Sequence, residues 1–575
     1  MKFNVTAQII SLSLILLCFG CSQPKQDYAT MLIFGGTIYT VEEAQPIVEA
    51  VAVKDNKILF TGSLAEAEMF KNENTQLIDL EGKTMTPGLI EGHGHFMGLG
   101  YNELRLDLLG TTSYQDIIDA VAERVKTAKP GEWITGRGWH QSKWDSLPKD
   151  MVNGFQTHYR LSEVSPDNPV YLSHASGHAG FANEKAMEIA GLVKLADDGI
   201  KKFEVGGGEV IVDASGRPTG VFNERAQTLI TKHIPERTPE TDLQAFELAV
   251  KACHKNGITS FHDAGIPKET IALYEQMKTQ NKLDVRIYAM LTGWDKDLLN
   301  AWYDKGIMVD QDHRFTIRSI KLNCDGALGS RGAWLLEPYT DRQDHFGHET
   351  LPMAFVKETS IKGLEHGFQV CSHAIGDRAN REILDRYELA INQLPEKASD
   401  HRFRIEHAQH LHPEDIPRFA ELKVIPAMQA VHMSSDRPWA IDRLGEKRIK
   451  EGAYMWQSLL QSGVPIVNGT DVPVEPINPI ASFFASVSRK TLKGTPEGGY
   501  EPEQKMTREQ ALKSYTLDAA FGAFEEDIKG SIEKGKLADF TIYDQDLMTV
   551  PENDILNTRI AMTIFDGKVV FKQKD

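Results

Sequence analysis

Eight short apolar segments dominate the middle of this 575-residue chain, and each ends in polar or titratable residues. Stretches of helical character, such as 378–392 and 456–461, fall between them. Strands that alternate with helices form a parallel sheet, so eight strand–helix units predict an α/β fold, a closed (β/α)8 barrel of the TIM type. Chemistry in such a barrel lies at the carboxyl ends of the strands. The predicted strands are 89–95, 257–263, 285–290, 317–323, 368–373, 403–407, 424–429 and 465–471.

The segments on either side of the barrel, 30–86 and 530–575, are short-stranded and β-rich. An Asp55-Asn56 turn between two apolar runs predicts a hairpin in the first of them. A closed barrel begins and ends on the same side, so the two ends are expected to build one small composite β-sandwich domain around a barrel at 87–529.

A large insertion is predicted after the first strand, at about 101–240. The interval from His95 to Lys321 is far longer than three strand–helix units of roughly thirty residues each require. The inserted segment is rich in Trp, Gly and His, which suits a lid or substrate wall.

Composition excludes several classes of protein. Hydrophobic residues make up 41% and charged residues 25%, as in a soluble globular enzyme. The formal net charge is −18, and no basic patch is visible in the sequence, so nucleic acid is not an expected partner.

The first 21 residues predict a secretory signal, because Lys2 precedes the apolar run 9–17. Gly20 directly before Cys21 resembles the bacterial lipoprotein box, in which that cysteine is lipidated after cleavage. The sequence therefore predicts an exported lipoprotein of the bacterial cell envelope, anchored only by its lipid and facing the periplasm or the surface. Secretion without a lipid is the alternative. The remaining cysteines, Cys253, Cys324 and Cys371, are too few and too far apart for a disulfide framework.

Two histidines, His93 and His95, end the first predicted strand. Side chains at i and i+2 share a face of a strand, so both rings can converge on one metal ion. The alternative is a turn whose histidines only form hydrogen bonds. Further strands bring more candidate groups to the same mouth of the barrel. They are Lys321, His373, His407 and Asp471.

Together these motifs resemble those of the amidohydrolase superfamily, in particular its group similar to N-substituted formamide deformylases. The resemblance covers nearly the whole chain after residue 30. It rests on the segments 87–95, 321–330, 373–377, 405–408 and 469–473.

The resemblance implies one or two divalent metal ions, with zinc the expected metal. His93 and His95 would bind one ion, His373 and His407 a second, and Lys321, carboxylated on its amine, would bridge them. An unmodified lysine is a cation, whereas a carbamate is an anionic oxygen donor.

The alternative for Lys321 is an ion pair with Asp325, which would favour a single ion held by the histidines and Asp471. Glu91 departs from the family pattern, which has aspartate there, and this bears on the orientation of the first histidine.

Asp471 is the predicted general base and acid, which takes a proton from metal-activated water and passes it to the leaving amine. A helix cap is its alternative role. Weaker candidates for substrate contact, each equally compatible with a structural role, are His178, Glu224, Asp325, Arg331, Arg378 and His432.

The predicted function is hydrolysis of a non-peptide carbon–nitrogen bond in an N-acyl or N-formyl amide or a cyclic amide. The expected partner is a small-molecule amide, and a homo-oligomer is compatible with the sequence. The rival from another class is a catalytically silent lipoprotein that binds a metal or solute and has a regulatory role.

Overall fold

The structure is a computed structural model, and it describes residues 27–574 apart from 142–143, 175–178 and 194–207. Eight parallel strands follow one another around a central barrel in the order of the sequence, which confirms the predicted fold. A short strand, β15 (Met308–Val309), pairs antiparallel with the fourth. The eight strands are β6 (Leu89–Gly94), β13 (Ile258–Ile266), β14 (Arg286–Thr292), β16 (Phe315–Asn323), β17 (Gln369–Ala374), β18 (Arg404–His407), β19 (Ile425–Met428) and β20 (Val467–Asn468).

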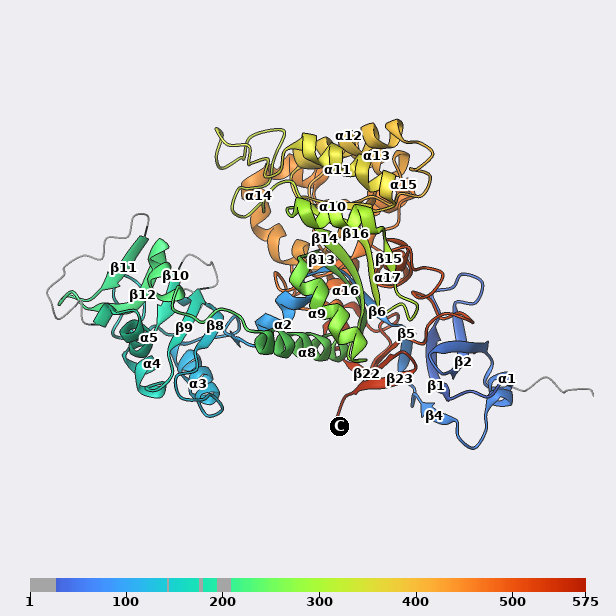
Figure 1. The fold of residues 1–575 in the computed structure, drawn as a ribbon, viewed down its shortest axis with the longest axis horizontal. Coiled ribbons are helices and arrows are strands. Elements are labelled where there is room, and N and C mark those ends of the chain that lie inside the picture. Colours follow the sequence, from blue (N-terminus) through green and yellow to red (C-terminus); the bar gives the residue numbers. More distant parts are fainter. Residues whose placement is uncertain (1–26, 142–143, 175–178, 194–207, 575) are drawn as a thin grey trace, which may run out of the picture.

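Helices surround the barrel (Figure 1). In α12, Ile383, Leu384, Tyr387 and Ala390 are buried at helical spacing, so this helix packs one apolar face on the barrel. The helices are α2 (Phe96–Glu103), α8 (Pro239–Lys255), α9 (Lys268–Thr279), α10 (Lys296–Lys305), α11 (Met353–His366), α12 (Asp377–Gln393), α13 (Ile416–Glu421), α14 (Ala430–Gly452), α15 (Trp456–Ser462), α16 (Pro479–Ser488), α17 (Arg508–Ser514) and α18 (Leu517–Phe521).

The barrel closes where β6 meets β20. No ladder joins the two strands, but the Asp471 amide donates to the His93 carbonyl at 2.8 Å. A Cβ on Gly92 would lie 2.4 Å from the Asn468 carbonyl oxygen, and one on Gly469 would lie 2.7 Å from the His93 nitrogen. Only glycine permits so close an approach of the two backbones.

Both ends of the chain share one eight-stranded sheet. Strand β5 from the N-terminal part pairs antiparallel with β21 from the C-terminal part, and β2 and β3 form the predicted hairpin. The short helix α1 (Leu64–Ala67) follows β3. The strands are β1 (Met31–Tyr39), β2 (Ile47–Lys54), β3 (Lys57–Gly62), β4 (Gln76–Asp79), β5 (Thr84–Pro87), β21 (Phe540–Tyr543), β22 (Ile560–Phe565) and β23 (Lys568–Lys572).

The insertion forms a separate lobe, on the left in Figure 1, that connects to the barrel through α2 and α8. A six-stranded sheet with its own buried apolar clusters supports it. Its elements are β7 (Leu106–Asp107), α3 (Tyr114–Val125), β8 (Ile134–Trp139), α4 (Tyr159–Val164), β9 (Val170–His174), β10 (Ala179–Ala182), α5 (Glu184–Ile189), β11 (Gly208–Val212), β12 (Pro218–Glu224) and α7 (Thr228–Thr231).

The three cysteines within the described ranges, Cys253, Cys324 and Cys371, are free and buried. Among the described residues, no helix combines the length and the apolar character needed to cross a membrane. The predicted lipidation site, Cys21, lies outside those residues.

Candidate metal centre

The predicted site residues meet at one cavity of about 330 Å³ at the carboxyl ends of the barrel strands. His93 lies directly behind this cavity, with its Nε2 atom 3.6 Å from the Asp471 carboxylate. The structure therefore brings together all six groups named from the strand ends. The described residues that line the cavity all belong to the barrel; they are His95, Ala264, Gly265, Thr292, Trp294, Lys321, Asn323, His373, His407 and Asp471.

His93, His95 and Asp471 form the tightest part of the cluster, with one ligand atom of each within 4.8 Å of the others. The His95 Nε2 atom lies 3.2 Å from Asp471 Oδ1. His93 is 1% exposed, and its Nε2 atom is buried without a hydrogen-bond partner in the described part of the chain. Two imidazole nitrogens and a carboxylate oxygen that converge in this way fit a divalent metal ion.

The other ring nitrogens of these histidines are anchored to the protein. His95 Nδ1 lies 3.0 Å from the Ala264 carbonyl oxygen, and His407 Nδ1 lies 2.7 Å from the Gln429 side-chain oxygen. Such contacts fix the ring and leave the second nitrogen available for a ligand. The rings of His373 and His407 are 4.3 Å apart between centroids, which makes them the second candidate pair of ligands.

Two site residues have backbone conformations in the left-handed region, His407 with φ 74° and Asp471 with φ 57°. A non-glycine residue in a sparsely populated region of this kind costs roughly 1–3 kcal/mol. At the end of β18, the left-handed backbone conformation of His407 lets its side chain line the cavity. The side chain of the preceding residue, Glu406, contacts His93 below the cavity. Strain at this point is thus part of how the site is assembled.

Burial and contacts between the side chains together set the pKa values of these groups. It lowers the pKa of His93 to about 4, although the Glu406 carboxylate opposes it, and it holds the pKa of His407 well below the usual range. Burial raises the pKa of Asp471, but contacts with His95, His407 and His93 outweigh it and keep that pKa well below the usual range. Burial lowers the pKa of His95 too, but its contact with Asp471 outweighs burial and raises that pKa above the usual value. Neutral imidazoles, as burial favours for His93 and His407, and an ionised carboxylate are the protonation states in which such side chains bind metal.

Lys321 is 5% exposed, and burial lowers the pKa of its amine. The alternative partner, Asp325, is engaged by other groups, because its carboxylate accepts backbone N–H groups of Trp334, Ile375 and Gly376 at 2.8–3.0 Å. Its Oδ1 atom also lies 3.3 Å from Nε2 of His373, which lines the cavity. Among the described residues, Lys321 forms no ion pair with Asp325. Asp325 instead holds the loops after β16 and β17 together.

The weaker candidates for substrate contact have different surroundings. Arg331 pairs with Asp341 at 2.8 Å, and Arg378 lies over the Trp334 ring at 4.5 Å. The ring of His432 stacks 6.3 Å from that of His407, beside the cavity. His178 and the side chain of Glu224 lie outside the described residues.

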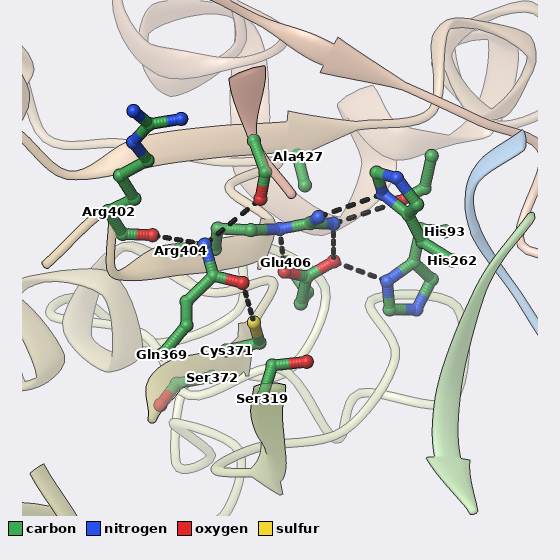
Figure 2. Close-up of polar contacts among 12 residues, drawn as sticks. His93, His262, Ser319, Gln369, Cys371, Ser372, Arg402, Arg404, Glu406 and Ala427 are labelled. Carbon is green, nitrogen blue, oxygen red and sulfur yellow. Dashed lines mark hydrogen bonds and ion pairs between the residues drawn. The ribbon is translucent and has the colours of Figure 1, made fainter. Parts of the chain in front are cut away.

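The sequence predicted no role for Glu406 and Arg404, two charged residues that lie below the cavity (Figure 2). Glu406 contacts His93 Nδ1 and forms an ion pair with Arg404. The signal was two charged side chains at alternate positions of an otherwise apolar strand. Glu91, whose identity bore on the orientation of the first histidine, instead accepts from the Thr470 amide at 2.5 Å and so holds the chain next to Asp471.

Trp294 at the rim of the cavity was also missed. It is 58% exposed, although indole is among the largest apolar side chains. Trp294 follows the predicted strand 285–290, and this position just after a strand end could have indicated that it lies at the mouth of the barrel.

A (β/α)8 barrel with histidines, a lysine and an aspartate at its strand ends is the architecture of metal-dependent hydrolases. The model of the Amidohydrolase family matches residues 76–571, and the chain belongs to that family.

Individual relatives agree with this assignment. The chain is 31% identical to Protein LONG AFTER FAR-RED 3 of Arabidopsis thaliana, over 95% of this chain and 92% of the relative. It is 25% identical to the N-substituted formamide deformylase of Arthrobacter pascens, over 94% and 98% of the two chains. Among solved structures, an uncharacterized metal-dependent hydrolase from Pyrococcus furiosus matches with a TM-score of 0.71 and 27% identity, over 90% of this chain and all of that one.

Proposed function

We propose that this protein is a metal-dependent amidohydrolase that cleaves a non-peptide carbon–nitrogen bond in an N-acyl or N-formyl amide or a cyclic amide. The observation that carries the proposal is the convergence of His93, His95 and Asp471 within 4.8 Å, with a buried His93 Nε2 atom that has no hydrogen-bond partner among the described residues. Similarity to a relative named as an N-substituted formamide deformylase supports the class of bond.

The residues that would hold zinc or a similar divalent ion are His93 and His95 for one ion and His373 and His407 for a second. Lys321, if carboxylated by carbon dioxide, would bridge them. A bound divalent ion supplies Lewis acidity, which makes water more acidic and polarises a substrate carbonyl.

Asp471 moves the proton in this proposal. Its carboxylate accepts a proton from the attacking water as the new carbon–oxygen bond forms, and it returns that proton to the nitrogen as the carbon–nitrogen bond breaks. Its backbone amide bonds to the His93 carbonyl, so the base and the first histidine keep a fixed relation. Trp294 offers an apolar surface at the rim, and Asn323 offers an amide that can hydrogen-bond to a substrate.

The same proposal places the protein at a membrane through a lipid on Cys21, exported to the bacterial cell envelope. The proposed binding partner is a small-molecule amide substrate, and nucleic acid is not a proposed partner.

A panel of N-formyl amines, N-acyl amino acids and cyclic ureides tests the proposal. The product to be measured is the free amine for the N-formyl and N-acyl compounds and the ring-opened ureido acid for the cyclic ureides. Protein stripped with a chelator should form no product, and zinc with bicarbonate should restore product formation from at least one class. Metal-loaded protein that forms no product from any class would favour the silent metal- or solute-binding lipoprotein.

A further inference from the structure

A pair of opposite charges lies inside the barrel directly below the metal centre. Glu406 and Arg404, both on β18, are completely buried. The guanidinium donates to the two carboxylate oxygens, from Nε at 2.7 Å and from Nη2 at 2.8 Å. Figure 2 shows Glu406 between Arg404 and the His93 ring, and its carboxylate makes a short contact with His93 Nδ1.

Arg404 also ties this pair to two other strands. Its Nη2 atom donates to the Gly92 carbonyl on β6 at 2.8 Å, and its Nη1 atom lies 3.0 Å from His262 Nδ1 on β13. Gly92 is the residue immediately before His93. The network therefore fixes both the backbone that leads into His93 and the ring itself.

The orientation of the ring follows from these contacts. With Nδ1 held by a carboxylate, the Nε2 lone pair of His93 is directed at Asp471 and the cavity. A carboxylate in this position fixes the tautomer, removes rotational freedom from the ring and makes its other nitrogen a better donor to a cation.

We propose that Glu406, held by Arg404, is a positioning residue that sets the affinity of the His93, His95 and Asp471 site for a divalent metal, an inference that rests on the proposed metal-dependent function. The pair acts through His93 and does not itself touch the substrate. Partners of metal-bound histidines are commonly worth about 10–100-fold in metal affinity.

A second buried pair provides a matched control. Arg286 on β14 binds Asp539 through two hydrogen bonds of 2.6 and 3.0 Å, and the two side chains are 1% and 4% exposed. This pair joins the barrel to the C-terminal part of the terminal sheet. Arg286 also donates to Asp312, His313 and Asp566, none of which is a residue of the metal centre. Removal of the Asp539 charge should therefore destabilise the fold, as removal of the Glu406 charge does, but it should leave metal binding unchanged.

Zinc affinity of full-length Glu406→Gln and Asp539→Asn, measured by competition with a chelator, tests the inference. Glu406→Gln should bind at least one zinc ion about 10–100-fold more weakly than wild type does. The zinc affinity of Asp539→Asn should stay within about threefold of the wild-type value. The absorption bands of bound Co²⁺ should shift in Glu406→Gln and not in Asp539→Asn. Both variants should melt at a lower temperature, because Glu406→Gln leaves Arg404 buried without its counter-charge and Asp539→Asn leaves Arg286 paired only with Asp566.

If Glu406→Gln does not fold, Glu406→Asp keeps the charge but draws the carboxylate back by one methylene, and it should weaken zinc binding in the same direction. Wild-type zinc affinity and an unchanged Co²⁺ spectrum in the folded variant would overturn the positioning role. The readout needs no substrate. Wild-type protein that binds zinc but hydrolyses nothing would therefore contradict the proposed function and leave this inference intact.

Discussion

The proposed number of metal ions depends on one residue, Lys321. Its amine lies at the cavity that His373, His407 and Asp471 share, and its burial lowers the pKa. An uncharged amine is the form that adds to carbon dioxide, with loss of a proton, to give a carbamate. The carbamate would supply the anionic oxygens that a bridge between two ions requires.

Lys321→Ala should therefore lose most of its metal, and short carboxylates such as formate should restore a part. Metal content of wild type should also depend on bicarbonate during reconstitution. Lys529→Ala is a suitable control, because Lys529 is equally buried but bonds to Ser260 and Glu525 away from the cavity. Full metal occupancy in untreated Lys321→Ala, measured by atomic emission, would refute the bridge.

Site residues could be predicted where their position along a strand places them at its carboxyl end. His93, His95, Lys321 and Asp471 were found in this way. Glu406 lies within 405–408, one of the segments on which the family resemblance rests. Its role depends on a contact with His93 across the barrel, and strand periodicity does not specify such contacts.

At the scale of elements, the seam between β6 and β20 explains both a correct prediction and its error in length. The eighth strand exists, but its ladder covers only Val467–Asn468 of the predicted 465–471. Beyond it, the Thr470 amide bonds to the Glu91 side chain and the Asp471 amide to the His93 carbonyl. These bonds lie outside the ladder of the sheet, and they position Asp471, the proposed general base.

Gly469→Ala tests this seam. The new methyl group would lie 2.5 Å from Glu91 Oε1 and 2.7 Å from the His93 nitrogen, so the strands must separate. The expected loss is about 1–3 kcal/mol in the free energy of unfolding, as for other overpacked interiors. In Gly110→Ala the new methyl group would meet no atom of the described residues within 4 Å, so this change should be nearly neutral. Equal denaturation midpoints for the two variants would contradict the account of the seam.

At the scale of the whole molecule, sequence predicted the barrel and the sheet shared by both ends, because each depends on local periodicity and chain order. The spatial role of the insertion was harder to predict. The described part of the insertion forms its own cores, and the described residues that line the cavity all come from the barrel. The place of a lobe relative to a site depends on contacts between distant residues, which composition does not encode.

The anchor is a prediction about the whole molecule as well. If Cys21 is lipidated, Cys21→Ser should move the protein from the membrane fraction to a soluble or unprocessed pool, because the lipid is the only proposed membrane contact. Immunoblots of fractionated cells measure this directly. Unchanged fractionation would reject the lipid anchor.

The central claim is that Asp471 moves the proton in a metal-dependent hydrolysis. Asparagine keeps its shape and one oxygen donor but is no base near neutral pH, so Asp471→Asn should retain at least the metal held by His373 and His407. General-base catalysis is usually worth about a hundredfold to ten-thousandfold, so kcat should fall by at least that range while KM changes little.

The most direct measurement is therefore turnover of metal-loaded Asp471→Asn on the best substrate, with its metal content and pH profile determined on the same sample. The account predicts loss of kcat by about a hundredfold or more, retained metal, and disappearance of the acidic limb of kcat/KM that wild type should show as this carboxylate is protonated. Hydrolysis by the metal-loaded variant within about threefold of wild type would contradict it.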